Sequence, residues 1–152
     1  MRHIHRLTAL VAVALFTVAC GGGDKAAADS MAAMSMSAAG ATLNGPIEPA
    51  AGGKVIEIMM TTNDQGNFFD PKDIEANPGD VLRYKLNIGV HNVNFLADSN
   101  PGKTGLPPMS AFLQLPGQTH DVAVSFAEGT YYFQCDPHVA LGMKGYVKVV
   151  KK

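Results

Sequence analysis

The sequence has no tryptophan and only two cysteines, Cys20 and Cys135, among its 152 residues. Two cysteines cannot supply the disulfide framework on which many small exported domains depend. Charge is also scarce: 12 lysines and arginines stand against 13 aspartates and glutamates. This balance excludes the electrostatic footprint of a nucleic-acid-binding protein. The length fits one ordinary domain with some additional sequence.

The first 19 residues have the pattern of an export signal. Two arginines and two histidines within the first six residues precede an uncharged, apolar run over residues 7–19, as in a signal peptide. As a helix this run would rise only about 20 Å, too little to span a bilayer core. We therefore expect residues 1–19 to be a leader that directs the chain out of the cytoplasm.

The leader ends in the sequence Thr17-Val18-Ala19-Cys20-Gly21, which resembles the lipobox of bacterial lipoproteins. The resemblance implies that Cys20 becomes the lipidated first residue of the mature protein. The chain would then be anchored to a bacterial membrane, in the periplasm or at the cell surface. Thr17 stands where lipoproteins usually have an aliphatic residue, so conventional cleavage without a lipid is the alternative.

Residues 20–53 consist mainly of glycine, alanine, serine and methionine, with too few large apolar side chains to form a core. We expect a flexible tether that begins at the lipidated Cys20 and has a reach of roughly 30 Å. The character changes at Lys54, and residues 54–152 are expected to form the ordered domain. If Cys20 carries a lipid, Cys135 has no disulfide partner, which leaves an intermolecular bond, a buried thiol or a metal-bound thiolate.

The expected domain contains short strand-like segments and no amphipathic helix. Residues 121–126 alternate between polar and apolar side chains, and residues 145–150 do the same at the end of the chain. Glycine and proline turns separate such segments, which favours an all-β fold, an antiparallel sandwich or barrel. Strands are expected at residues 55–60, 81–88, 92–95, 119–126, 130–135 and 146–150, with a long loop over 97–118 that contains one helical turn near 110–113.

One loop of nine residues carries three side chains that bind metals: Cys135, His138 and Met143. A thiolate, an imidazole and a thioether in this order are the donors of a trigonal His-His-Cys copper site with a weak axial methionine. The second imidazole is assigned to His91, which begins a strand-like segment whose apolar side chains share its face. His120 lies in a polar segment and is interpreted as solvated surface.

Residues 54–152 resemble the plastocyanin branch of the cupredoxins. The resemblance rests on the turn at residues 77–81, on His91-Asn92-Val93, and on the loop Cys135-x-Pro137-His138-x4-Met143. It implies a cupredoxin-like Greek-key β-sandwich that holds one copper ion, as Cu(I) or Cu(II). The equatorial ligands would be His91, Cys135 and His138, and the axial ligand Met143. Asn92 would fasten the two ligand-bearing segments together.

The same resemblance implies that electrons pass through an exposed edge of His138. Val90, Pro107 and Leu141 are expected to form an apolar patch around this edge, suited to brief contacts with a redox partner. We therefore expect a monomeric type 1 (blue) copper protein that passes single electrons between extracytoplasmic partners and binds no nucleic acid.

Two other functions stay open on the sequence alone. Met31, Met34 and Met36 lie in the expected tether and offer thioethers to Cu(I), as a protein that delivers copper to a cuproenzyme would need. A structural zinc ion at the same ligands is the other possibility. Catalysis is not expected, because a copper enzyme would need a second, histidine-rich copper site and only His120 is left over in the mature chain.

Overall fold

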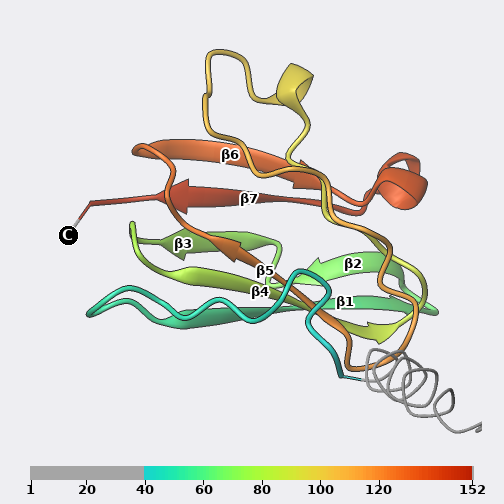
Figure 1. Cartoon of the computed structure of the whole chain (residues 1–152). Coiled ribbons are helices and arrows are strands. Elements are labelled where there is room, and N and C mark those ends of the chain that lie inside the picture. Colours follow the sequence, from blue (N-terminus) through green and yellow to red (C-terminus); the bar gives the residue numbers. More distant parts are fainter. Residues whose placement is uncertain (1–39, 152) are drawn as a thin grey trace, which may run out of the picture.

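The computed structural model describes residues 40–151, which form a sandwich of two β-sheets (Figure 1). The four-stranded sheet has the order β2-β1-β4-β5, and the three-stranded sheet has the order β3-β7-β6. The strands are β1 (Val55–Asn63), β2 (Gly66–Asp70), β3 (Asp73–Ala76), β4 (Val81–Ile88), β5 (Thr119–Ala123), β6 (Gly129–Gln134) and β7 (Lys144–Val149). Two short 3-10 helices, η1 (Ala97–Ser99) and η2 (Asp136–Leu141), lie in the connections.

Both sheets are mixed. β1 pairs with β4 in parallel and β3 pairs with β7 in parallel, whereas the pairs β1–β2, β4–β5 and β6–β7 are antiparallel. The all-β sandwich expected from the sequence is confirmed, but its pairing is not antiparallel throughout. The alternation of side chains along a strand reports which face is buried. It does not report the direction of the neighbouring strand.

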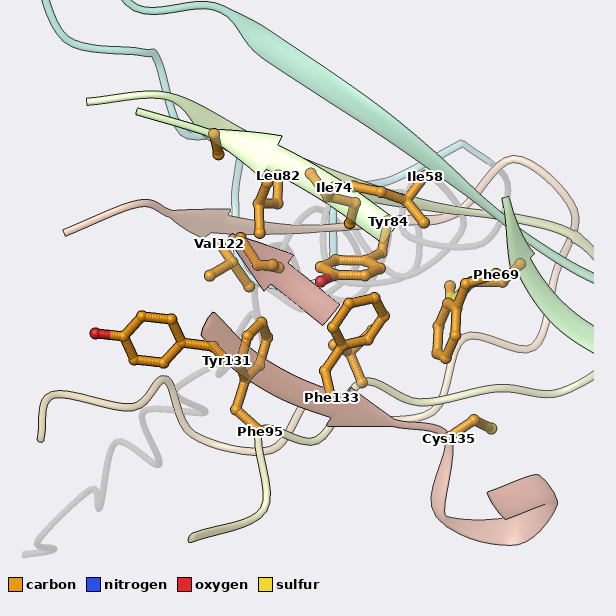
Figure 2. Packing of buried hydrophobic residues seen from close by; sticks show 14 of the residues in the cluster. Ile58, Phe69, Ile74, Leu82, Tyr84, Phe95, Val122, Tyr131, Phe133 and Cys135 are labelled. Carbon is orange, nitrogen blue, oxygen red and sulfur yellow. The ribbon is translucent and has the colours of Figure 1, made fainter. Parts of the chain in front are cut away.

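The core between the sheets is built from aromatic rings. Tyr84 of β4 packs edge-on against Phe69 of β2 and Phe133 of β6, with ring centroids 6.0 and 5.4 Å apart (Figure 2). Edge-to-face pairs of this kind add stability beyond the apolar area that they bury. Phe133 is fully buried and stands two residues before Cys135. The core therefore fixes the end of β6 from which the ligand loop starts.

Residues 92–95 do not form the strand that the sequence suggests. They contribute only an isolated bridge, from Asn94 to the end of β6. The neighbouring His91 forms a second isolated bridge, with Leu113. The helical turn expected near residues 110–113 is also not formed, because the backbone there is extended and pairs with the histidine segment. The prediction of a strand at this position was wrong, although the segment still lies across the core.

Residues 40–50, which we call the strap, lie along the free edge of β5 (Figure 1). Thr119 N–H donates to the carbonyl of Ala41 at 3.0 Å, and its own carbonyl accepts a second backbone bond from the strap at 2.8 Å. Two residues along β5, the side chain of Asn44 bonds to both the N–H and the carbonyl of Asp121. These strap residues fall in the expected tether, yet they cover an edge strand. The division into leader, tether and domain otherwise stays a prediction.

Asp121 holds the strap through a buried carboxylate. Its side chain is 0% exposed and accepts hydrogen bonds from Arg83 Nε at 2.9 Å, from Arg83 Nη2 at 2.7 Å and from Ile47 N–H at 3.0 Å. Burial by itself raises the pKa of Asp121, but the bonds from Arg83 and Ile47 outweigh it and hold the pKa below the ordinary value of 3.8. The buried ion pair therefore stays charged and joins β4, β5 and the strap.

His120 is not the solvated side chain that the sequence suggests, since it is only 8% exposed. His120 stands opposite the buried Tyr84 of β4, on the inward face of the sheet, whereas the strap covers its neighbours Thr119 and Asp121. His120 lines a pocket of about 410 Å³ together with Pro107, Met109 and Phe126. Burial lowers the pKa of its imidazole, so His120 is a neutral residue of the interior.

Candidate metal centre

Three of the predicted ligands meet at one end of the sandwich. The ligand atoms of His91, Cys135 and His138 all lie within 4.8 Å of one another. Cys135 Sγ is 3.6 Å from His91 Nδ1 and 3.4 Å from His138 Nδ1, and the two Nδ1 atoms are 3.1 Å apart. Donors about 2.0–2.3 Å from a central ion in a trigonal plane stand about 3.5 Å apart. This triangle therefore has the dimensions of a site for one transition-metal ion.

Met143 lies at the same end of the core and is fully buried. Its N–H donates to the carbonyl of His138 at 3.1 Å, and its carbonyl accepts a bond from Cys135 N–H at 3.1 Å. The backbone that places the thioether thus also places two of the other ligands. A thioether beside a thiolate and two imidazoles is a donor set that selects copper.

The carbonyl of Ile88 sets the orientation of His91. His91 Nε2 lies 3.1 Å from this carbonyl oxygen and 3.3 Å from Thr62 Oγ1. Because a carbonyl only accepts hydrogen bonds, Nε2 carries the proton and Nδ1 presents its lone pair to the other ligands. Burial also lowers the pKa of His91. The residue is therefore held in the neutral form that binds a metal.

Gly89 makes room for this arrangement. Its φ is +109°, in the region that favours glycine, and a Cβ here would stand 2.6 Å from His91 Nε2 and 2.6 Å from Thr62 Oγ1. A larger residue would displace His91 from the carbonyl that orients it. The sequence reasoning overlooked Gly89, although a glycine two residues before a candidate ligand is the signal that could have found it.

Cys135 and His138 are brought together by the tight turn of η2. His138 N–H donates to the carbonyl of Cys135 at 3.0 Å, and Gly142, with φ +91°, ends the turn in the left-handed region. Burial raises the pKa of the Cys135 thiol, while the N–H groups of Asn92 and His138 act against the rise. Binding of a metal ion to this thiol therefore displaces a proton.

Asp136 joins the His91 segment to the ligand loop. Its carboxylate accepts side-chain amide bonds from Asn92 at 2.8 Å, Asn94 at 3.0 Å and Gln134 at 2.7 Å, and its own N–H donates to Asn92 Oδ1 at 2.8 Å. Burial by itself raises the pKa of Asp136, but the three amides outweigh it and lower the pKa. Asn92 was predicted to fasten the two segments, whereas the hydrogen bonds that place Asp136 at the centre of the network were not predicted.

His138 borders a shallow hollow on the surface. The hollow is lined by Thr62, Asn67, Gly89, Val90, Phe112, Gln114, Pro137 and His138. None of these side chains carries a fixed charge. Val90 and Phe112 are each 47% exposed, and Leu141 on η2 is 68% exposed. Pro107, which was also expected at this patch, instead lines the separate pocket beside His120.

Comparison with known proteins supports the interpretation of this site as a copper centre. A model of the family described as copper binding proteins, plastocyanin/azurin family, matches residues 56–150. The chain belongs to this family. Plastocyanin from Vicia faba is 36% identical over 99 residues, which are 62% of this chain and 99% of that protein. Chloroplastic plastocyanin from Hordeum vulgare is 35% identical over 130 residues, which are 84% of this chain and 77% of that protein.

Solved structures of the plastocyanin/azurin family and its neighbours agree with the fold. Oxidized plastocyanin from Dryopteris crassirhizoma matches with a TM-score of 0.51 and 25% identity, covering 62% of this chain and 100% of that chain. A reduced mutant amicyanin matches with a TM-score of 0.53, covering 72% of this chain and 90% of that chain, and at 18% identity it supports the fold alone. The predicted cupredoxin fold and its single copper ion are confirmed. His91, Cys135, His138 and Met143 fit such a site.

Proposed function

We propose that this chain carries single electrons between extracytoplasmic redox proteins, using one copper ion held by His91, Cys135, His138 and Met143. The observation that carries the proposal is the triangle of two Nδ1 atoms and one Sγ atom in a member of the plastocyanin/azurin family. Bound copper supplies one-electron chemistry, since sulfur ligands suit Cu(I) and imidazoles also suit Cu(II).

The chain contributes a ligand set that is held in place before an electron arrives. His91, Cys135 and Met143 are each 0% exposed, so water has little access to the donors. The network around Asp136 ties the segment of His91 to the loop of the other ligands. Ligands fixed in this way need little rearrangement when the charge of the centre changes, which favours fast transfer.

Electrons are proposed to enter and leave through His138, the ligand that lines the surface hollow. We call Val90, Phe112 and Leu141, with the exposed edge of His138, the port. Apolar contacts dominate at the port, because no lysine, arginine, aspartate or glutamate lines the hollow. Docking there should depend little on ionic strength.

Leu141→Glu tests the port, with the protein acting as its own partner. The substitution places a carboxylate on each of two facing ports, so electron self-exchange between the reduced and oxidised forms should slow by roughly tenfold. Leu141 is 68% exposed, so the absorption spectrum and the stability should not change. NMR line broadening measures the exchange rate. Val55→Glu, at an exposed position on the far end of β1, is the control, and equal slowing in both variants would contradict the port.

The cellular location is proposed from the sequence. The leader and Cys20 lie outside the described residues, and the support for a lipid anchor is the lipobox-like segment that ends at Cys20. In residues 40–151, no helix is long and apolar enough to cross a membrane. We propose that the mature chain is exported and is held at a bacterial membrane by lipid on Cys20.

Reversible redox cycling of the copper-loaded chain separates the two candidate functions. A carrier takes up one electron per copper and keeps its metal against a Cu(I) chelator through repeated cycles. A delivery protein loses copper to the chelator when it is reduced. Met31, Met34 and Met36, on which the delivery hypothesis rests, lie outside the described residues. The buried ligand set favours the carrier, and rapid loss of copper in the reduced state would reject it.

A further inference from the structure

Because of the strap, the chain enters the domain at the opposite end of the sandwich from the start of β1. β1 begins at Val55, which pairs with Val81 at the start of β4. This is the end of the sandwich farthest from the copper ligands, since His91 follows the opposite end of β4. At this far end, Ala50 N–H donates to the carbonyl of Gly79 at 2.9 Å. Followed backward along the chain from Ala50, the strap runs along β5 to the ligand end (Figure 1).

Gly40, the first described residue, lies near the ligand end. A Cβ on Gly117 would stand 3.5 Å from Gly40 Cα, and Gly117 N–H donates to the carbonyl of Leu86 at 2.8 Å. Leu86 is two residues before Ile88, whose carbonyl faces His91 Nε2. The chain therefore enters the domain at the end of the sandwich that carries the copper ligands. The last strand, β7, runs away from them toward the far end (Figure 1).

We propose that the strap turns the copper end of the domain toward the membrane that holds Cys20, so that the port meets a redox protein embedded in that membrane. The proposal rests on the lipid anchor of the proposed function. The eight residues of β4 span about 26 Å. A chain that entered at the far end would hold the port farther from the membrane by about this length.

The uncharged lining of the port agrees with such a partner. A soluble partner found by diffusion gains speed from complementary charge. A partner in the same membrane is already concentrated by the anchor, so the encounter does not depend on electrostatic attraction. The port and the attachment point therefore suit the same partner, a membrane-embedded redox protein with an apolar face.

The test compares two attachment points on one protein. The chain from Cys20 onward contains every residue that the structure describes; it is loaded with Cu(II) and coupled through Cys20 to a maleimide lipid in phosphatidylcholine vesicles. The comparison protein has Cys20→Ser and carries a copy of residues 21–39 with a final cysteine after Lys152. Cys135 is 0% exposed, so the buried thiol does not compete for the lipid.

Pulsed EPR then measures the distance from Cu(II) to nitroxide-labelled lipid headgroups. The most probable distance should be shorter by roughly 10 Å when the protein is attached through Cys20, because the port then lies on the membrane side of the domain. Reduction by a ferrocene-labelled lipid in the same vesicles should also be faster, by roughly fivefold. Equal distances for the two attachments would overturn the proposal.

A second pair of variants isolates the strap. Thr42→Ala with Asn44→Ala removes the hydroxyl contact to Thr119 and the two side-chain bonds to Asp121. The EPR distance should then move toward that of the comparison protein. Thr130→Ala with Asn63→Ala, at two exposed positions, should leave it unchanged. The backbone bonds from the strap to Thr119 remain in this variant, so faster hydrogen exchange at the Thr119 N–H first shows that the strap has left β5. An unchanged EPR distance would then reject the role of the strap.

The copper spectrum of every variant shows whether a negative result concerns the orientation alone or the proposed function as well. Normal blue copper with equal EPR distances would reject the orientation and leave the carrier function intact. A protein that forms no blue site would overturn the proposed function, and with it the orientation that depends on it.

Discussion

Replacing Cys135 with serine is expected to abolish the intense blue absorption and the narrow copper hyperfine splitting of the Cu(II)-loaded protein. Both signals come from a copper–thiolate bond, and a hydroxyl oxygen is too hard a donor to replace sulfur. Affinity for Cu(I) should fall by more than about 100-fold, beyond the loss that follows from removing a residue that only supports a ligand. Visible and EPR spectra with one equivalent of Cu(II), followed by a competition titration with a Cu(I) chelator, measure the two effects.

Two histidine variants provide the matched comparison. His91→Ala removes an imidazole from the ligand triangle and should also abolish the blue band. His120→Ala removes another buried imidazole, 8% exposed, from outside the metal cluster, and should leave the band in place. If the band survived His91→Ala, or if it disappeared in His120→Ala, the ligand assignment would be contradicted.

Replacing Asp121 with alanine should produce the largest loss of stability away from the metal. The substitution leaves the partly buried guanidinium of Arg83 without its carboxylate, and it removes the acceptor for the N–H of Ile47. Breaking one partner of a buried ion pair typically costs about 3–5 kcal/mol. The side chain of Arg83 is 25% exposed and can regain some water, so we expect a value of about 3 kcal/mol. Urea denaturation of the copper-free protein measures it.

The pH dependence of this loss follows from the lowered pKa of Asp121. The unfolded chain takes up a proton near the ordinary value of 3.8, before the folded chain does. The ion pair therefore stabilises the protein fully above that value, and its contribution disappears as the pH falls through the lower pKa of the folded state. The difference between Asp121→Ala and the parent should shrink below about pH 4.

Glu75→Ala is the control for this ion pair. Glu75 lies 3.7 Å from Lys148, and both side chains are more than 60% exposed, at 66% and 63%. Exposed pairs contribute about 0.5 kcal/mol or less. Equal losses for Glu75→Ala and Asp121→Ala, or a loss at Asp121 that does not change with acid, would show that the buried pair does not act as described.

The copper centre could be predicted from the sequence because three of its ligands share one loop. The order of Cys135, His138 and Met143 matches the needs of copper before any fold is known. His91 could be chosen because it begins an apolar segment and the only rival, His120, has polar neighbours. The supporting residues were harder to find, since the amides that converge on Asp136 come from positions far apart in the chain.

The features that escaped prediction depend on long-range contacts. The strap has the composition of a linker, and its bonds come from single polar side chains such as Asn44 rather than from a periodic pattern. His120 resembles a surface residue because its neighbours in the sequence are polar, and only the pairing with β4 places it opposite the buried Tyr84. The port shows the same limit: Phe112 lies in a loop far along the chain from His138, and only the fold places it in the same hollow.

The strap also protects the protein against aggregation with other copies of itself. β5 lies at one edge of its sheet, and an open strand edge is a template on which a second chain can form further β-structure. The N–H and carbonyl groups of Thr119 and Asp121 on this edge are all occupied by strap residues. A shortened protein that began at Lys54, where the composition changes, would expose this edge. Aggregation of such a fragment would reflect its uncovered edge strand and not a weakness of the copper domain itself.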